Sequence, residues 1–344
     1  MRRRGNTVLV GALIVVALTF LVGQAKVPYV QLEPGPTYDT LGKDDSGKDV
    51  IVVNGAKPTS SAGQLRFVTV GVRPELTLLE ALQGWLRDND AVVPRELVYP
   101  PDKTQDQIDK QNAEDFAKSQ SDAETAALTE LGYPMRIAVK EVTAGSPAQG
   151  KLKPGDMITK VDGTAVDSAD KLLELIRAKP VGTTLTFEVI RAGTPQTVKI
   201  ATVAGDGGVP RVGFTPEITS SAPFSLDIPI EGIGGPSAGL MLSLGIIDKI
   251  KPEDLTGGKI IAGTGTIDAI GNVGPIGGVP QKLVGAKSAG ATYFLTPQAN
   301  CGEAVANAQS GLTLVQVGTL DEALAALKSI RTGAQPTLCP GVNS

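Results

Sequence analysis

The chain has 344 residues, of which 41% are hydrophobic and 20% are charged, and its formal net charge is −4. This composition is typical of globular domains, the length favours two or three of them, and the negative balance gives no electrostatic reason to expect a nucleic-acid partner. The chain has no histidine and only two cysteines, so the usual ligands of transition metals are scarce. We therefore expect no metal site and no cofactor.

The N-terminus carries the clearest targeting signal. Arg2, Arg3 and Arg4 precede an uncharged run from Gly5 to Ala25, which Lys26 ends. A run of this length is sufficient for a membrane-spanning helix, and the basic cluster would remain in the cytoplasm. We therefore expect residues 1–26 to form a single-pass anchor in the cell membrane, with the rest of the chain outside the cytoplasm. A cleavable signal peptide is the alternative, and both place the body in an extracytoplasmic compartment.

An extracytoplasmic compartment is oxidising and permits disulfides. Cys301 and Cys339 are the only pair available within the chain, so they are the candidates for a disulfide. The alternative is that both cysteines remain unpaired.

Short alternating apolar runs between Gly, Pro and Ser clusters predict strands and hairpins from Val27 to about Pro101. The next segment, "DKTQDQIDKQNAEDFAKSQSDAETAALTEL", has no Gly or Pro and few apolar positions. These features predict a solvated helix that links two domains. We expect residues 27–130 to form a β-rich region that ends in this helix.

Residues 131–204 resemble a PDZ domain. The strands "MRIAVKEV", "DMITKVDG" and "TTLTFEVIRAG" and the capped helix "SADKLLELIRA" surround the run "VTAGSPAQGKLKPGDMITKVDGTAV", which is similar to bacterial PDZ modules. The resemblance implies that Leu131, Gly132 and Tyr133 form the carboxylate-binding loop. It also implies that the strand from Met135 through Ile137 to Val139 is the edge that a peptide extends. The alternative is a spacer domain whose groove is empty or filled by its own chain.

A serine motif opens the last part of the chain. Gly235-Pro236-Ser237-Ala238-Gly239 fits the G-x-S-x-G pattern of serine hydrolases, and an apolar helix, "SAGLMLSLGIID", starts at its serine. The start of a helix favours a developing anion, but a serine there is also a common helix cap. An esterase of the α/β-hydrolase type is excluded because its base would be a histidine.

One lysine has surroundings suited to a base. Val279, Leu283 and Ala286 form the apolar face of a predicted helix, and Lys282 lies on that same face near the helix start. Burial there would lower the pKa of the amine, although a lysine that extends its ammonium to the surface is the alternative. Four other lysines lie beside turns or polar faces, and we expect them to be solvated: Lys249, Lys251, Lys259 and Lys287.

The runs "GGPSAGLMLSLGII" and "IAGTGTIDAIGNVGPIGGVPQKLVGAKSAGA" resemble the serine and lysine motifs of the Lon protease domain. The resemblance implies that Ser237 is the nucleophile, Lys282 its base, and Thr264 the hydroxyl that holds the lysine. We expect backbone N–H groups near Gly235, Pro236 and Ala238 to form the oxyanion site. Lon resemblance also implies a homo-oligomeric ring such as a hexamer.

Together these features resemble the membrane-anchored PDZ–Lon-like proteases of bacteria. We expect an α+β multidomain protein with a transmembrane helix, a β-rich region, a PDZ domain, a Lon-type α/β domain over residues 205–335 and a tail over 336–344. Its predicted activity is cleavage of polypeptides by a Ser-Lys dyad. We expect this cleavage to be independent of ATP, because the sequence has no Walker A motif. The expected substrates are therefore flexible termini, loops or damaged proteins. A PDZ adaptor with a silent Lon-like domain is the rival hypothesis.

Overall fold

The computed structural model describes residues 11, 13, 21–44, 46–87, 89–133, 135–166, 168–220 and 222–341. Most of the expected anchor, residues 1–26, lies outside this part of the chain. Among the described residues, none of the helices is both long enough and apolar enough to span a bilayer.

The chain forms two compact units. Unit 1 combines residues 1–127 with residues 224–344, and unit 2 is residues 128–223. This differs from the sequence-based division, in which residues 27–130 formed a region of their own and the third region began at residue 205. Unit 2 is instead inserted into unit 1, because strands from both ends of the chain pair in one sheet.

That sheet of unit 1 has six strands in the order β20-β19-β16-β4-β2-β6. The first four strands are parallel, whereas β4, β2 and β6 are antiparallel. Leu65 and Phe67 of β4 pair with Ile261 and Gly263 of β16, so a strand from the first hundred residues lies in the middle of the later sheet. The strands are β2 (Tyr29–Asp39), β4 (Gln64–Arg73), β6 (Ala91–Pro94), β16 (Ile260–Gly263), β19 (Tyr293–Pro297) and β20 (Thr313–Val317).

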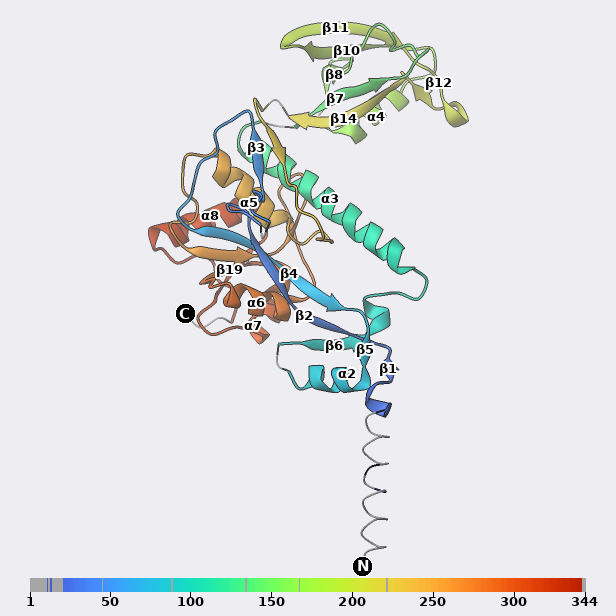
Figure 1. Ribbon diagram of the computed structural model, residues 1–344. Helices are drawn as coiled ribbons and strands as arrows, with labels where there is room; N and C mark the ends of the chain where they lie inside the picture. Colours follow the sequence, from blue (N-terminus) through green and yellow to red (C-terminus); the bar gives the residue numbers. More distant parts are fainter. Residues whose placement is uncertain are drawn as a thin grey trace, which may run out of the picture. The chain divides into compact units, whose positions relative to one another are not determined.

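Helices cover both faces of this sheet. Figure 1 shows α5 (Gly239–Ile250) and α8 (Leu320–Thr332) on one side of the strands, with α6 (Val279–Ser288) and α7 (Cys301–Ala306) on the other. Helix α5 is buried from Gly239 to Lys249, as its continuous apolar sequence requires. Unit 1 also contains α2 (Leu78–Trp85) and three two-stranded sheets, which pair β1 (Lys26–Val27) with β5 (Leu76–Thr77), β3 (Val52–Asn54) with β15 (Ser225–Asp227), and β17 (Thr266–Ile267) with β18 (Val273–Gly274).

The long helix α3 (Gln105–Glu130) matches the predicted helix, but it is not solvated on all sides. Ile108, Phe116 and Ala123 are buried, and the Ser119 hydroxyl donates a hydrogen bond of 2.9 Å to the carbonyl of Pro236. Through these contacts most of α3 belongs to unit 1. It therefore packs against the segment that carries the serine motif.

Unit 2 contains a five-strand path in the order β11-β10-β8-β7-β14, with the short β9 beside β8. Its core includes Phe187, Leu185, Ile158 and Ile200. Ser168 caps α4, as the sequence predicted, by accepting a 3.2 Å hydrogen bond from the backbone of Lys171. The elements are β7 (Met135–Val142), β8 (Met157–Val161), β9 (Thr164–Ala165), α4 (Ala169–Arg177), β10 (Thr184–Arg191), β11 (Thr194–Ala201), β12 (Val203–Ala204), β13 (Pro210–Arg211) and β14 (Phe214–Ser220).

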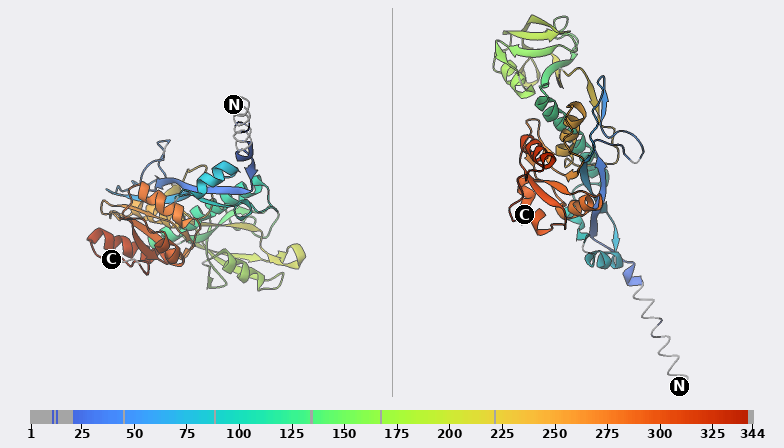
Figure 2. Two further views of the ribbon diagram at one scale, coloured as in Figure 1. Left: turned by 90° about the horizontal axis from the view of Figure 1, so that it is seen from below. Right: turned by 90° about the vertical axis from the view of Figure 1, so that its left-hand side faces the viewer.

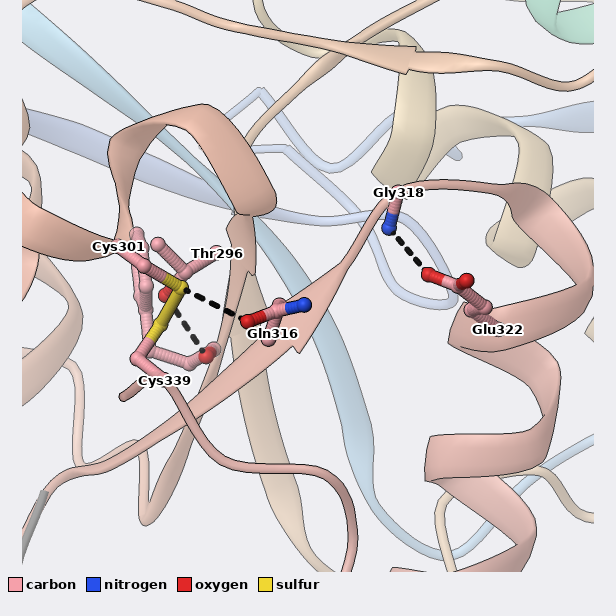
Figure 3. The surroundings of a disulfide bond; sticks show 7 residues. Thr296, Cys301, Gln316, Gly318, Glu322 and Cys339 are labelled. Carbon is pink, nitrogen blue, oxygen red and sulfur yellow. Dashed lines mark hydrogen bonds between the residues drawn. A yellow bond between two sulfur atoms is a disulfide. The ribbon is translucent and has the colours of Figure 1, made fainter. Parts of the chain in front are cut away.

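A disulfide joins Cys301 and Cys339, with 5.2 Å between their Cα atoms. Figure 3 shows the sulfur–sulfur bond between α7 and the C-terminal tail, beside Gln316 of β20. The tail also pairs with β20, because Gln316 donates to the carbonyl of Thr337 and Cys339 to that of Leu314. A closed loop of this size stabilises a fold by roughly 2–4 kcal/mol.

Candidate active site

A cleft of about 530 Å³ in unit 1 contains Ser237 and Lys282. Its walls come from β2, the second half of β4, the loop from Gly232 to Ala238, and the start of α6 with the glycines before it. These segments lie far apart in sequence and meet because β4 and α6 pack together at the sheet.

Ser237 lies two residues before α5, and the geometry there requires small neighbours. A Cβ atom on Gly239 would come within 2.8 Å of the Ser119 hydroxyl and 2.9 Å of Ile267, so the start of α5 packs directly against α3 and β17. The carbonyl of Ser237 accepts hydrogen bonds from the backbone of Gly265 at 2.9 Å and from the Thr264 hydroxyl at 3.0 Å. The backbone at the serine is thereby fixed.

The structure narrows the choice of oxyanion donors. Pro236 has no N–H group, and the N–H of Gly235 already donates to the carbonyl of Asn112 in α3 at 2.9 Å. Within the described chain, the backbone N–H groups of Ser237 and Ala238 donate no hydrogen bond to another backbone group. These two groups, at the positive end of α5, are therefore the available donors.

Lys282 lies in the first turn of α6, where the sequence placed it. The helix begins after Gly278, and the φ of 70° at this residue favours glycine. A Cβ atom added to Gly278 would lie 2.6 Å from the side chain of Val70 in β4. This close approach brings the helix start onto β4. As a result, the Lys282 side chain is only 3% exposed.

Burial lowers the pKa of Lys282 from 10.5 to about 7, and desolvation is the cause. An amine with this pKa is neutral in a large fraction of molecules at neutral pH. Its neutral form has a lone pair and can accept a proton. The geometry thus gives Lys282 the property that a general base needs.

Thr264, which follows β16, connects the lysine to the serine backbone. The Lys282 Nζ donates to Thr264 Oγ1 at 3.1 Å, and the Thr264 hydroxyl donates its proton to the Ser237 carbonyl. The neutral Lys282 amine therefore donates one of its N–H groups to the Thr264 hydroxyl, and this bond does not involve the lone pair on Nζ. No hydrogen bond joins Ser237 Oγ directly to Lys282 Nζ among the described residues, although both line one cleft. Catalytic hydrogen bonds are often longer before substrate binds.

Comparisons with known proteins identify two domain families in this chain. Residues 107–202 match the PDZ domain family, and residues 211–329 match the Lon protease (S16) C-terminal proteolytic domain. The chain carries a PDZ domain and a Lon-type proteolytic domain. These matches confirm the two domain types expected from the sequence, and the Lon-type match contains Ser237, Thr264 and Lys282.

The relatives that match this chain are Lon proteases, and each is similar to part of it. Lon protease 1 of Sorangium cellulosum is 38% identical over 106 residues, which cover 29% of this chain and 13% of the relative. Lon protease 2 of Bacillus subtilis is 38% identical over 94 residues, which cover 27% of this chain and 16% of the relative. The chain thus spans about a seventh of these relatives' lengths.

A solved PDZ domain, that of an SdrC-like protein of Listeria monocytogenes, is 28% identical. The similar region covers 24% of this chain and 86% of the Listeria chain, with a TM-score of 0.23.

In the expected carboxylate-binding loop of the PDZ domain, two backbone N–H groups already donate hydrogen bonds within the chain. The backbone of Gly132 donates to the carbonyl of Thr129 and that of Tyr133 to Leu128 at 2.8 Å, because these residues end α3. Gly132 has a φ of 82°, which is common just after a helix. Leu131, Gly132 and Tyr133 therefore form a helix end, and the two donated N–H groups are not free to hold a carboxylate.

The expected peptide-binding edge is also absent. Ile137 pairs with Ile158 of β8 on one side and with Ile218 of β14 on the other, so β7 is an inner strand. The side chain of Met135 lies outside the described residues, but its backbone pairs with Ser220. The sequence pattern identified the strand correctly and assigned it the wrong place in the sheet, because a strand's neighbours are not encoded in its own residues.

The edge strands of this sheet are β11 and β14, and a groove of about 360 Å³ lies beside β14. Leu172 and Ile176 of α4 line this groove together with Val212, Gly213 and Phe214. The backbone N–H groups of Val212 and Gly213 donate no backbone hydrogen bond within the described chain. The groove therefore combines an edge strand with two backbone N–H groups that have no backbone acceptor in the described chain.

A second buried lysine was not expected. Lys249, near the end of α5, is 7% exposed rather than solvated, because α5 is buried along its length. Burial lowers the pKa of Lys249, while the carboxyls of Asp49, Asp39 and Asp248 raise it. The run of apolar residues before Lys249 was the signal in the sequence that could have predicted its burial.

Proposed function

We propose that this chain is a serine endopeptidase in which Ser237 is the nucleophile and Lys282 the general base. The observation that carries the proposal is a buried lysine with a pKa of about 7 in the same cleft as a serine at a helix start. The Lon-type match over these residues supports it.

The substrate would bind as an extended strand along β4. Only Gln64 to Phe67 of β4 pair with β16, so the side of β4 from Val68 to Val72 that faces away from β2 has no strand partner among the described residues. That same stretch lines the cleft beside Ser237. Backbone pairing there would hold many sequences, which suits the cleavage of flexible termini, loops or damaged proteins.

Acyl transfer follows from the named groups. Ser237 Oγ attacks the peptide carbonyl carbon, the lone pair of Lys282 Nζ takes the hydroxyl proton, and the Ser237 and Ala238 N–H groups receive the oxyanion. The Lys282 ammonium then gives its proton to the leaving amine as the C–N bond breaks. Lys282 next removes a proton from water, which attacks the ester carbonyl carbon. The bond between that carbon and Ser237 Oγ then breaks, the acyl group leaves as the carboxylic acid, and the Lys282 ammonium returns the proton to Ser237 Oγ.

The proposal includes a membrane anchor at residues 1–26, a body outside the cytoplasm and cleavage without ATP. The uncharged run after three arginines supports the anchor, and the absence of a Walker A motif from the sequence supports the last point. A ring of identical chains, implied by the Lon resemblance, is tested by the mass of the detergent-solubilised protein in solution.

Covalent labelling tests the nucleophile. A fluorophosphonate should label Ser237 in the full chain, as read by peptide mass spectrometry, and Lys282→Arg should abolish the label because guanidinium stays protonated. Lys287→Arg, an exposed lysine on the same helix, is the matched control and should label normally. An unlabelled wild-type protein would favour the adaptor hypothesis instead.

We also propose that the groove beside β14 binds peptide C-termini, for which the free strand edge and the Val212 and Gly213 N–H groups are the support. Calorimetry with paired free-acid and amidated peptides is the test. The free acid should bind more tightly, and equal affinities would leave strand pairing alone as the interaction.

A further inference from the structure

Helix α2 exposes an unusual number of large apolar side chains. Leu79, Leu82, Trp85 and Leu86 are 47%, 46%, 53% and 85% exposed. We call these four residues the apolar face of α2. Other exposed apolar residues, such as Ile218 and Ile270, lie on separate elements. Contiguous apolar surface of this kind marks an interaction site.

The helix is firmly placed and its other side is already used. Thr77 and Glu80 form a reciprocal cap at its start. Ala81 and Gly84 are buried, and a Cβ on Gly84 would be 2.6 Å from Val92 of β6. The apolar face is therefore the outer side of a helix that cannot turn inward.

The described end of the N-terminal segment is bonded to this helix. Leu78 donates a hydrogen bond of 2.9 Å to the carbonyl of Ala25, and Lys26 and Val27 pair with Thr77 and Leu76. Figures 1 and 2 show α2 beside the blue start of the described chain, with β1, β5 and β6 at the same end of unit 1. The last residue of the uncharged run, Ala25, is therefore in direct hydrogen-bond contact with the first residue of α2.

The apolar face and the N-terminal segment are on the same side of α2. A Cβ on Gly23 would lie 3.7 Å from the Cβ of Leu79, and Leu82 and Leu86 follow Leu79 at helical spacing. Leu21 and Val22, just before Gly23, are also exposed. The apolar surface is thus continuous from the end of the uncharged run onto α2.

Trp85 has the arrangement of an interfacial aromatic residue. Its ring meets Tyr29 edge-on, with 5.6 Å between centroids, and its indole N–H donates to the carbonyl of Val92 at 3.3 Å. The polar atom therefore faces the protein backbone, while half of the ring is exposed. Tryptophan and tyrosine concentrate at the boundary between lipid headgroups and acyl chains.

We infer that the apolar face of α2 inserts into the lipid headgroup–acyl boundary of the bilayer that the N-terminal segment crosses. The inference rests on the proposed membrane anchor, since that segment brings α2 to the bilayer surface. An amphipathic helix at this boundary buries its apolar face while its other side stays on the protein. The contact would hold unit 1 at a fixed height and orientation on the membrane.

Trp85 is the single tryptophan of the chain and reports on this contact directly. In the full chain reconstituted into phosphatidylcholine–phosphatidylglycerol vesicles, Trp85 fluorescence should be quenched by lipids with a shallow acyl-chain quencher and protected from aqueous iodide. The Leu82→Glu variant should reduce the lipid quenching and restore iodide quenching. The control is Trp85→Phe with Ile270→Trp, because Ile270 is 84% exposed on a different loop; this probe should respond to iodide only.

A Leu13→Trp probe in the Trp85→Phe background tests the anchor separately, with a quencher deep in the acyl chains. Deep quenching of that probe without shallow quenching of Trp85 would overturn the α2 contact and leave the anchor proposal standing. A Trp85 signal that is shielded from iodide but not quenched by lipid would show that protein, such as a second copy, covers the apolar face of α2, and would also overturn the α2 contact.

If neither probe is quenched by lipid, both proposals fail. Shallow quenching of Trp85 without deep quenching of the Leu13→Trp probe would support the α2 contact and overturn the anchor.

Discussion

Unit 1 contains two buried lysines on different helices, and they differ in what surrounds them. Lys282 begins α6 and Lys249 ends α5, and their side chains are 3% and 7% exposed. Burial lowers the pKa of both. Three carboxyls oppose this effect at Lys249, whereas desolvation alone acts on Lys282, whose hydrogen-bond acceptor is the neutral hydroxyl of Thr264.

The carboxyls near Lys249 also have structural partners. Asp248 accepts hydrogen bonds from the Ser61 hydroxyl and the backbone of Leu255, and Asp39 accepts them from the backbones of Leu41 and Leu65. Lys249 thus belongs to a charged cluster that ties α5 to β2 and neighbouring loops. Burial lowers the pKa of a lysine most where no carboxyl opposes it, so Lys282 is a better candidate for a general base than Lys249.

The largest expected difference between the two lysines is in catalysis. Lys282→Arg should lower peptide cleavage by roughly 10³-fold or more, because guanidinium cannot accept the serine proton. Lys249→Arg should keep most of the activity, since a permanent charge suits its carboxyl neighbours. Initial rates with a fluorogenic peptide measure both. Equal losses in the two variants would remove the distinction and the role assigned to Lys282.

The pH dependence of the rate sharpens the comparison. Since the pKa of Lys282 is about 7, cleavage should rise with pH through an apparent pKa near that value and level off above it. Lys249→Arg should give the same profile. A rate that continues to rise toward pH 10 would mean that the base has the ordinary pKa of lysine.

Stability should respond more strongly at Lys282 than at Lys249. The unfolded chain binds the Lys282 proton near pH 10.5 and the folded chain near pH 7, so below pH 7 the buried amine costs several kcal/mol of folding free energy. Lys282→Met should therefore raise the free energy of unfolding, and its advantage should disappear as the pH rises from 7 to 10.5. Lys249→Met should raise it less than Lys282→Met does, because the carboxyls around Lys249 offset part of the cost of burying its ammonium. Urea unfolding across this pH range is the measurement, and equal stabilisation by the two variants would contradict the assignment.

The smallest expected effect is at Thr264. Thr264→Val removes the acceptor of the Lys282 ammonium and should reduce kcat about two- to tenfold, the equivalent of one hydrogen bond. The apparent pKa of the rate should also shift slightly downward, because the charged amine loses a partner. Thr264→Ser should restore both values. A variant that loses rate without a pKa change would indicate a role in holding the Ser237 backbone only.

The sequence predicted much of the candidate site because its motifs are local. The helix start at Pro280, the inward face with Val279 and Leu283, and the serine before an apolar helix all follow from residues within a few turns. The candidate oxyanion donors were predicted as a range from Gly235 to Ala238. Pro236 has no N–H group, and the bond from the Gly235 N–H to the carbonyl of Asn112 in α3 removed a second candidate. Asn112 is more than a hundred residues away, and nothing in its own neighbourhood indicates that partner.

The sequence by itself was enough to predict the types of the elements, the two domain families, and Ser237 and Lys282 as candidate site residues. Periodicity, capping and motif spacing are properties of short segments, so they can be read without the fold. Tertiary structure alone decided the rest. It placed β4 from the first hundred residues in the six-stranded sheet beside Ser237 and Lys282, made β14 an edge strand and β7 an inner one, and put carboxyls near Lys249 but not near Lys282. The physical reason is the same in each case: strand partners and the charges around a buried amine come from residues that only folding brings together.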